Sequence, residues 1–126
     1  MKPIRKKYTI NASIEEVWKS LVNSSYIEKW GGGPAKMNDK VGTKFKLWGG
    51  DIYGKNIEIV PDKKLVQEWY SGAWAQPSIL TITLTKAKNK TRVVLKQTNV
   101  PKEEYDDIEK GWDEYYFEPI KELLEG

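Results

Sequence analysis

Residues 102–125 read KEEYDDIEKGWDEYYFEPIKELLE, a charged segment that also carries a dense group of aromatic side chains. Its apolar residues recur at steps of three and four, the spacing that places side chains along one face of an α-helix. These residues are Tyr105, Ile108, Trp112, Tyr115 or Tyr116, Pro119 or Ile120, and Leu123. So much aromatic surface needs a broad apolar partner, and we predict that this partner is a β-sheet.

Two residues within this predicted helix disfavour a regular α-helix. Gly111 costs about 1 kcal/mol relative to alanine in an exposed helix interior, although it also permits a close approach to a strand or a ligand. Pro119 has no N–H, so we expect it to remove one hydrogen bond and to bend the helix near Tyr115. With a bend there, Trp112 belongs to a pocket, whereas Ile120 anchors the helix end.

A strand and two short helices are predicted at the start of the chain. In residues 4–10 a strand with one solvated face is indicated, because Ile4, Tyr8 and Ile10 alternate with Arg5, Lys7 and Thr9. Ser13 and Glu16 form a capping box at the start of the first helix. The glycines at 31–33 end the second helix.

The middle of the chain predicts an antiparallel meander of about five strands. Residues 41–98 contain repeated apolar and polar alternation, interrupted by turn sequences such as Gly49-Gly50-Asp51. The predicted order of elements is therefore β-α-α-β-β-β-β-β-α. This order describes an α+β protein with about six strands and a long C-terminal helix, and we assign residues 1–126 to a single domain.

The composition narrows the range of chemistry. The chain has 126 residues, of which 39% are hydrophobic and 31% charged, with neither cysteine nor histidine. The absence of cysteine excludes disulfides and thiolate metal sites, and it fits a cytoplasmic location. Histidine is the commonest general base and a common metal ligand, so its absence weakens the case for catalysis. We predict no catalytic residue, cofactor or metal site, and a small enzyme such as a cyclase or hydrolase ranks lowest.

The charge pattern does not favour a polyanionic partner. The net charge is +3, and both signs are interspersed along the chain. The one basic cluster, formed by Lys2, Arg5, Lys6 and Lys7, is interpreted as a solvated strand face. We therefore predict no nucleic-acid partner. No segment approaches the length of about 20 apolar residues that a membrane span requires, so we also predict no span and no signal peptide.

Short motifs distributed over nearly the whole chain carry a family resemblance. They are Ala12-Ser13-x-Glu15-Glu16-Val17-Trp18, Trp30-Gly31, Val41-Gly42-Thr43-x-Phe45, Gly49-Gly50-x-Ile52-x-Gly54, Ile59-Val60-Pro61 with Leu65-Val66 before Trp69, Thr81-x-Thr83-Leu84, and Gly111-Trp112-x-x-Tyr115-Tyr116-Phe117-x-x-Ile120-Lys121. With these motifs the chain resembles the family named for the C-terminal domain of the activator of the heat-shock protein 90 ATPase. That family belongs to the START-related superfamily, also called SRPBCC. The resemblance implies a helix-grip fold, in which a curved antiparallel sheet wraps around the C-terminal helix.

The resemblance and the aromatic content together suggest a binding function. Helix-grip proteins hold apolar ligands between sheet and helix, so we predict a non-enzymatic domain with an internal cavity for a hydrophobic or aromatic small molecule. The candidate lining residues are Phe45, Trp69, Trp74, Trp112, Tyr115 and Tyr116. The simpler interpretation is that these rings only fill the core between helix and sheet. The family resemblance implies an alternative function, a protein-interaction domain of the chaperone-activator type with a chaperone as its partner.

Overall fold

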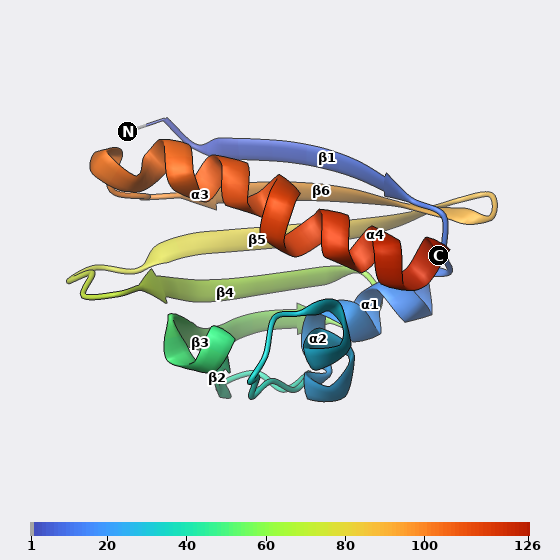
Figure 1. Ribbon diagram of the computed structural model, residues 1–126, viewed down its shortest axis with the longest axis horizontal. Coiled ribbons are helices and arrows are strands. Elements are labelled where there is room, and N and C mark those ends of the chain that lie inside the picture. The colour runs from blue at the N-terminus through green and yellow to red at the C-terminus, as the bar shows by residue number, and fades with distance from the viewer. Residues whose placement is uncertain (1) are drawn as a thin grey trace.

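The computed structural model describes residues 2–126, and its central feature is a curved six-stranded antiparallel sheet (Figure 1). The strand order across the sheet is β1-β6-β5-β4-β3-β2, so the first strand lies beside the last one. The strands are β1 Ile4–Ile10, β2 Lys44–Leu47, β3 Ile52–Val60, β4 Lys64–Ser71, β5 Ser78–Ala87 and β6 Lys90–Thr98. The predicted α+β class, the number of strands and their order along the chain are confirmed.

The strand register directs one set of side chains toward the C-terminal helix. On β6, Leu95 and Gln97 are buried, whereas Lys96 between them is exposed, as the period of two requires. β1 pairs with β6 so that Ile4 lies opposite Gln97. The inward positions of neighbouring strands therefore form one continuous face, apolar at most positions, and the C-terminal helix packs against it.

Local capping explains where the two short helices begin and end. α1 Ile14–Val22 starts at Ser13, whose Oγ accepts a hydrogen bond from the Glu16 N–H at 3.2 Å. α2 Ser24–Trp30 ends at Gly31, which adopts the left-handed conformation with φ of 102°. The predicted cap at Ser13 and the predicted glycine stop are confirmed. The reciprocal bond of the predicted capping box is not seen, because the Glu16 carboxylate accepts a hydrogen bond from the Tyr26 hydroxyl at 3.0 Å instead.

Residues 102–125 cross the sheet as one continuous helical segment, called the C-terminal coil below, but this segment is not a uniform α-helix (Figure 1). Its parts are the 3-10 turn η2 Lys102–Glu104, the α-helix α3 Tyr105–Gly111, the π-helical segment η3 Trp112–Phe117 and the α-helix α4 Glu118–Glu125. The Glu118 N–H donates to the carbonyl of Asp113, five residues earlier. Pro119 then occupies the first turn of α4, where an N–H is not needed. The π-helical segment before Pro119 thus allows the helical backbone to continue past the proline.

The core lies between this coil and the sheet. Trp112, Tyr116, Phe117 and Ile120 are each at most 2% exposed, and they belong to the same hydrophobic cluster as the inward residues of the strands. Within residues 2–126, no helix has the combination of length and apolar character that crossing a membrane requires.

Candidate functional site

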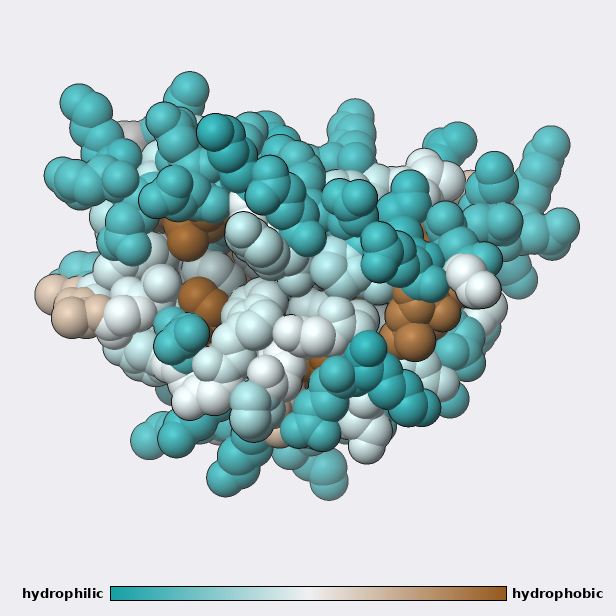
Figure 2. Space-filling model, in the orientation of Figure 1, coloured by the Kyte–Doolittle hydropathy of each residue, from teal (hydrophilic) through white to brown (hydrophobic). Residues whose placement is uncertain are grey.

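A pocket of about 370 Å³ opens beside Trp112, where α3 passes the turn between β2 and β3. That turn contains the 3-10 segment η1 Trp48–Gly50. Half of the lining residues are aromatic, namely Trp48, Trp69, Trp112, Tyr115 and Tyr116. Ile52, Ile108, Gly111 and two aspartates complete it. Figure 2 shows pale and brown surface in this region, between the hydrophilic atoms over α3 and those near β3.

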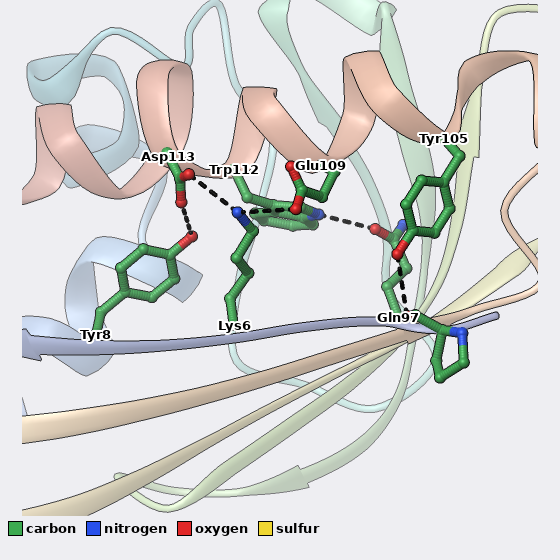
Figure 3. A network of polar contacts seen from close by, with 8 residues as sticks. Lys6, Tyr8, Gln97, Tyr105, Glu109, Trp112 and Asp113 are labelled. Atoms are coloured by element: carbon green, nitrogen blue, oxygen red, sulfur yellow. Dashed lines mark hydrogen bonds and ion pairs between the residues drawn. The ribbon is translucent and has the colours of Figure 1, made fainter.

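The orientation of Trp112 is fixed by a buried chain of hydrogen bonds. The Trp112 Nε1–H donates to Gln97 Oε1 at 2.8 Å (Figure 3), and Gln97 Nε2 donates to Ser78 Oγ at 2.8 Å. Gln97 and Ser78 are 0% exposed, so these bonds form where no bulk water competes for them. These hydrogen bonds hold the Trp112 indole in one orientation, in which it forms a rigid side of the pocket.

Tyr116 lies at the centre of the aromatic cluster behind the pocket. Its ring centroid is 4.7 Å from that of Trp112, 4.8 Å from that of Trp30 and 6.3 Å from that of Trp48. Desolvation raises the pKa of the Tyr116 hydroxyl, so this side chain is uncharged at neutral pH. The cluster therefore gives the pocket a rigid, uncharged back wall.

Four of the six predicted lining residues come together at the pocket. Trp69, Trp112 and Tyr116 are nearly completely buried, whereas Tyr115 is 65% exposed at the pocket's edge. The rings of Trp69 and Trp112 are 5.4 Å apart, which links β4 to the C-terminal coil. The sequence pattern placed either Tyr115 or Tyr116 on the apolar face of the C-terminal helix. In the structure Tyr116 packs in the core and Tyr115 borders solvent.

The other two predicted residues do not line this pocket. Phe45 is 1% exposed and packs in the core, where it lies opposite Gly54 in the register of β2 and β3. Trp74 is half-buried, 6.1 Å from Trp69 between ring centroids, and its Nε1–H donates to the carboxylate of Glu104. Trp74 therefore supports Trp69 from behind and ties its loop to the start of the C-terminal coil.

The fold also brings to the pocket several residues that no pattern in the sequence indicated. Trp48, Asp51 and Asp107 line it, although Trp48 and Asp107 are far apart in the chain. Gln97, which positions Trp112, was also missed. Its position offered a usable signal, because an amide at an inward place in an alternating strand needs a buried partner.

One polar atom at the pocket is left without a partner. Trp69 is 4% exposed, and its Nε1–H has no hydrogen-bond acceptor among residues 2–126. Buried donors are normally paired, but the Trp69 Nε1 has almost no accessible surface, so this unpaired donor is enclosed beside the pocket rather than open to it. Within the same residues, no group of three or more acidic side chains is arranged to hold a metal ion.

A polar network on the opposite side of the coil attaches it to β1. Lys6 Nζ lies 2.9 Å from Asp113 Oδ2 and 3.5 Å from Glu109 Oε2, and the Tyr8 hydroxyl donates to Asp113 Oδ1 at 2.7 Å (Figure 3). The Tyr105 hydroxyl donates to the Pro3 carbonyl at 3.2 Å. The interpretation of the N-terminal basic cluster as one solvated face is therefore wrong for Lys6, because Lys6 shares the inward face of β1 with Ile4 and Tyr8.

This network shifts the ionisation of its members. Burial raises the pKa of the Tyr8 hydroxyl, and the hydrogen bond to Asp113 adds to that shift. Desolvation alone would raise the pKa of Asp113, but the hydrogen bonds from Tyr8 and Lys6 and the Lys6 charge together hold it below its ordinary value. Asp113 is therefore ionised throughout the neutral range, where it fastens the coil to β1.

Asp113→Asn is expected to destabilise the protein at neutral pH and to lose that effect in acid. The folded-state pKa of Asp113 is below its unfolded value, so its contribution is complete above about pH 4 and disappears as the pH falls through the folded-state pKa. Urea unfolding of both proteins across this range measures the difference. Asp106→Asn, which removes an exposed carboxylate from α3, is the matched control. A difference between wild type and Asp113→Asn that stays constant with pH would contradict this account.

Gly111 does not mediate a close approach to a strand. A Cβ placed on it would meet only Tyr115 Cδ2, at 3.8 Å, and its φ of −61° is helical. We therefore expect Gly111→Ala to raise the free energy of unfolding by about 0.5–1 kcal/mol, the helix propensity difference between the two residues. Urea denaturation tests this prediction. A loss of stability would mean that the glycine is needed for packing after all.

The comparisons with known proteins agree with the fold. The family described as Activator of Hsp90 ATPase homolog 1-like protein matches residues 11–125. The human activator of 90 kDa heat shock protein ATPase homolog 1 is 29% identical over 120 residues, which are 94% of this chain and 36% of the human protein. The chain thus spans about a third of the length of the curated relatives it matches.

Solved structures extend the match to the three-dimensional arrangement. An HSP90 activator from Plasmodium falciparum has a TM-score of 0.88 at 22% identity, with 98% of this chain and 96% of that chain covered. The Aha1 dimer from Colwellia psychrerythraea has a TM-score of 0.86 at 20% identity, with 99% and 97% covered. These two structures share the helix-grip arrangement described above. Since the family match covers most of the sequence, the chain belongs to the family of Activator of Hsp90 ATPase homolog 1-like proteins.

Proposed function

We propose that this chain is a protein-interaction domain of the chaperone-activator type. The observation that carries the proposal is the family match over residues 11–125, to which the human relative and the Plasmodium HSP90 activator add support. The partner in this proposal is the 90 kDa heat-shock chaperone of the same organism. A cytoplasmic location is part of the proposal, since a chain without cysteine needs no oxidising compartment.

The proposal is tested by measuring the chaperone's ATPase rate with increasing amounts of this protein. We expect a saturable rise in the rate, together with a complex that is detected by pull-down. A heat-unfolded sample of the same chain serves as the control for nonspecific protein effects. An unchanged ATPase rate and no detectable complex, or a source organism without this chaperone, would refute the proposal.

A second candidate function is the binding of an apolar or aromatic small molecule in the pocket beside Trp112. The observation that favours it is the pocket itself, which has a volume of about 370 Å³ and five aromatic side chains in its lining, as is typical of ligand sites. Such a ligand would place its apolar body against the aromatic rings.

Titration with a panel of lipids and aromatic metabolites, followed by tryptophan fluorescence and melting temperature, tests this second function. Tyr115→Leu is a suitable pocket variant, because Tyr115 is 65% exposed and its replacement should change stability by no more than about 0.5 kcal/mol. We expect a binding compound to shift the emission and to bind this variant more weakly. If no compound in the panel alters either signal, the pocket is not a ligand site.

A further inference from the structure

The charge at the pocket beside Trp112 has the opposite sign to the charge of the whole chain. The net charge is +3, yet the lining contains Asp51 and Asp107 and neither lysine nor arginine. Both aspartates are exposed, and neither forms an ion pair with another of the residues 2–126. The pocket therefore has a negative rim that no side chain of the described part of the protein neutralises.

The aromatic walls add to this negative potential. The faces of indole and phenol rings carry the negative part of their quadrupole and attract cations. Elsewhere in the described chain, lysines occupy such faces: Lys2 lies over Tyr105, and Lys19 and Lys29 lie near the Tyr26 ring. Within residues 2–126 no lysine or arginine lies over the rings of the pocket. The half-buried Trp48 and the exposed Tyr115 offer the ring surface that a cation from outside can reach.

We propose that the pocket binds an organic cation, an alkylated ammonium or protonated amine carried on an apolar body. This inference rests on the second candidate function and specifies its ligand class. The alkyl groups contact the rings of Trp48, Trp112 and Tyr115, and the charge lies toward Asp51 and Asp107. Anionic amphiphiles are disfavoured, because their head group would meet two carboxylates and no basic partner.

Three probes of nearly equal shape separate charge from apolar contact. Choline is the cation, neohexyl alcohol is its uncharged isostere, and the carboxylate of tert-butylacetic acid is the anion. Titrations followed by the indole N–H resonances of Trp69 and Trp112 give each dissociation constant at the pocket itself. We expect choline to bind about threefold to thirtyfold more tightly than the alcohol, and the carboxylate to bind most weakly.

Variants assign the preference to the proposed groups. The double variant Asp51→Asn with Asp107→Asn should lose part of the advantage of choline over the alcohol, and Asp106→Asn, outside the pocket lining, should keep all of it. Tyr115→Leu should weaken choline binding more than alcohol binding, because it removes a ring face and keeps an apolar contact. Melting curves confirm that these exposed substitutions leave the fold intact.

The outcomes distinguish the two levels of the proposal. Equal or tighter binding of the neutral alcohol would overturn the cation preference and leave the pocket as an apolar site. If choline keeps its full advantage over the alcohol in the double aspartate variant and in Tyr115→Leu, the assignment of the cation preference to this pocket is overturned, because other groups would then recognise the charge. If none of the three probes shifts the Trp69 and Trp112 resonances and the wider panel also fails, both the ligand class and the second function are refuted.

Discussion

Gly54→Ala should lose about 3 kcal/mol or more of its free energy of unfolding, because β3 has no room for a Cβ at this position. Gly54 lies opposite Phe45 of β2 and opposite Trp69 of β4. A Cβ built there would be 1.8 Å from the carbonyl oxygen of Glu68 and 3.0 Å from Phe45 Cε2. The first contact is with backbone, which cannot rotate away, so β3 and β4 would have to separate and break part of their ladder.

Urea unfolding of Gly54→Ala measures this loss, with Gly111→Ala as the matched control. Both variants add one methyl group to a glycine, but only Gly54 lies against another strand. Separation of β3 from β4 would also displace Trp69, so we expect altered tryptophan fluorescence in any folded fraction of Gly54→Ala. A variant as stable as the wild type would show that the sheet relaxes locally at little cost.

The order of elements could be predicted because its signals are local. The cap at Ser13, the glycine stop at Gly31 and the alternation within each strand depend on neighbouring residues. Which strands are neighbours is a different matter. The pairing of β1 with β6 joins Ile4 to Gln97, and no pattern within either strand specifies that partner. The family resemblance, rather than periodicity, supplied the expectation of a sheet curved around the helix.

The π-helical segment explains why the apolar face predicted for a regular α-helix was incomplete. An α-helical repeat places the residues three and four after Trp112 on its face, which leaves Tyr115 and Tyr116 as equal choices. In the π-helical segment the bonding step is five residues, so Phe117 also turns toward the side that Trp112 occupies. Trp112, Tyr116 and Phe117 are consequently all buried, whereas Tyr115 is exposed. Pro119 indicated that the helix would be irregular, but nothing in the sequence specified a π-helical segment.

The pocket was only partly predictable for a related reason. Large aromatic residues are visible in any sequence, and Trp69, Trp112 and Tyr116 were identified on that basis. Whether a ring fills space or borders a pocket depends on how two distant segments approach each other. Trp48 and Asp51 reach the site because the β2–β3 turn lies against α3, which is a property of the tertiary arrangement.

Trp112→Ala is expected to lose about 3–5 kcal/mol of unfolding free energy, the range for truncation of a buried aromatic residue. Trp112 is 2% exposed and contacts the rings of Trp69, Tyr116 and Phe117, with centroid distances of 5.4, 4.7 and 6.1 Å. Its removal would therefore leave a cavity at the centre of the aromatic cluster. Urea denaturation is the measurement, and Tyr115→Ala provides a control in which an exposed neighbouring ring is removed. Equal losses for the two variants would contradict the assignment of Trp112 to the core.

The hydrogen bond from Trp112 to Gln97 can be separated from packing by a double-mutant cycle. Trp112→Phe keeps an aromatic ring but leaves Gln97 Oε1 buried without its donor, which costs about 1–3 kcal/mol. Gln97→Leu leaves the Trp112 Nε1–H unpaired instead, and the double variant removes both of these orphaned atoms. We therefore expect the double variant to lose less stability than the sum of the single losses, by about 1–2 kcal/mol. Trp112→Phe combined with Lys86→Ala, an exposed site on β5, should be additive. Additivity of the Trp112 and Gln97 substitutions would mean that the bond stabilises neither the coil nor the wall of the pocket.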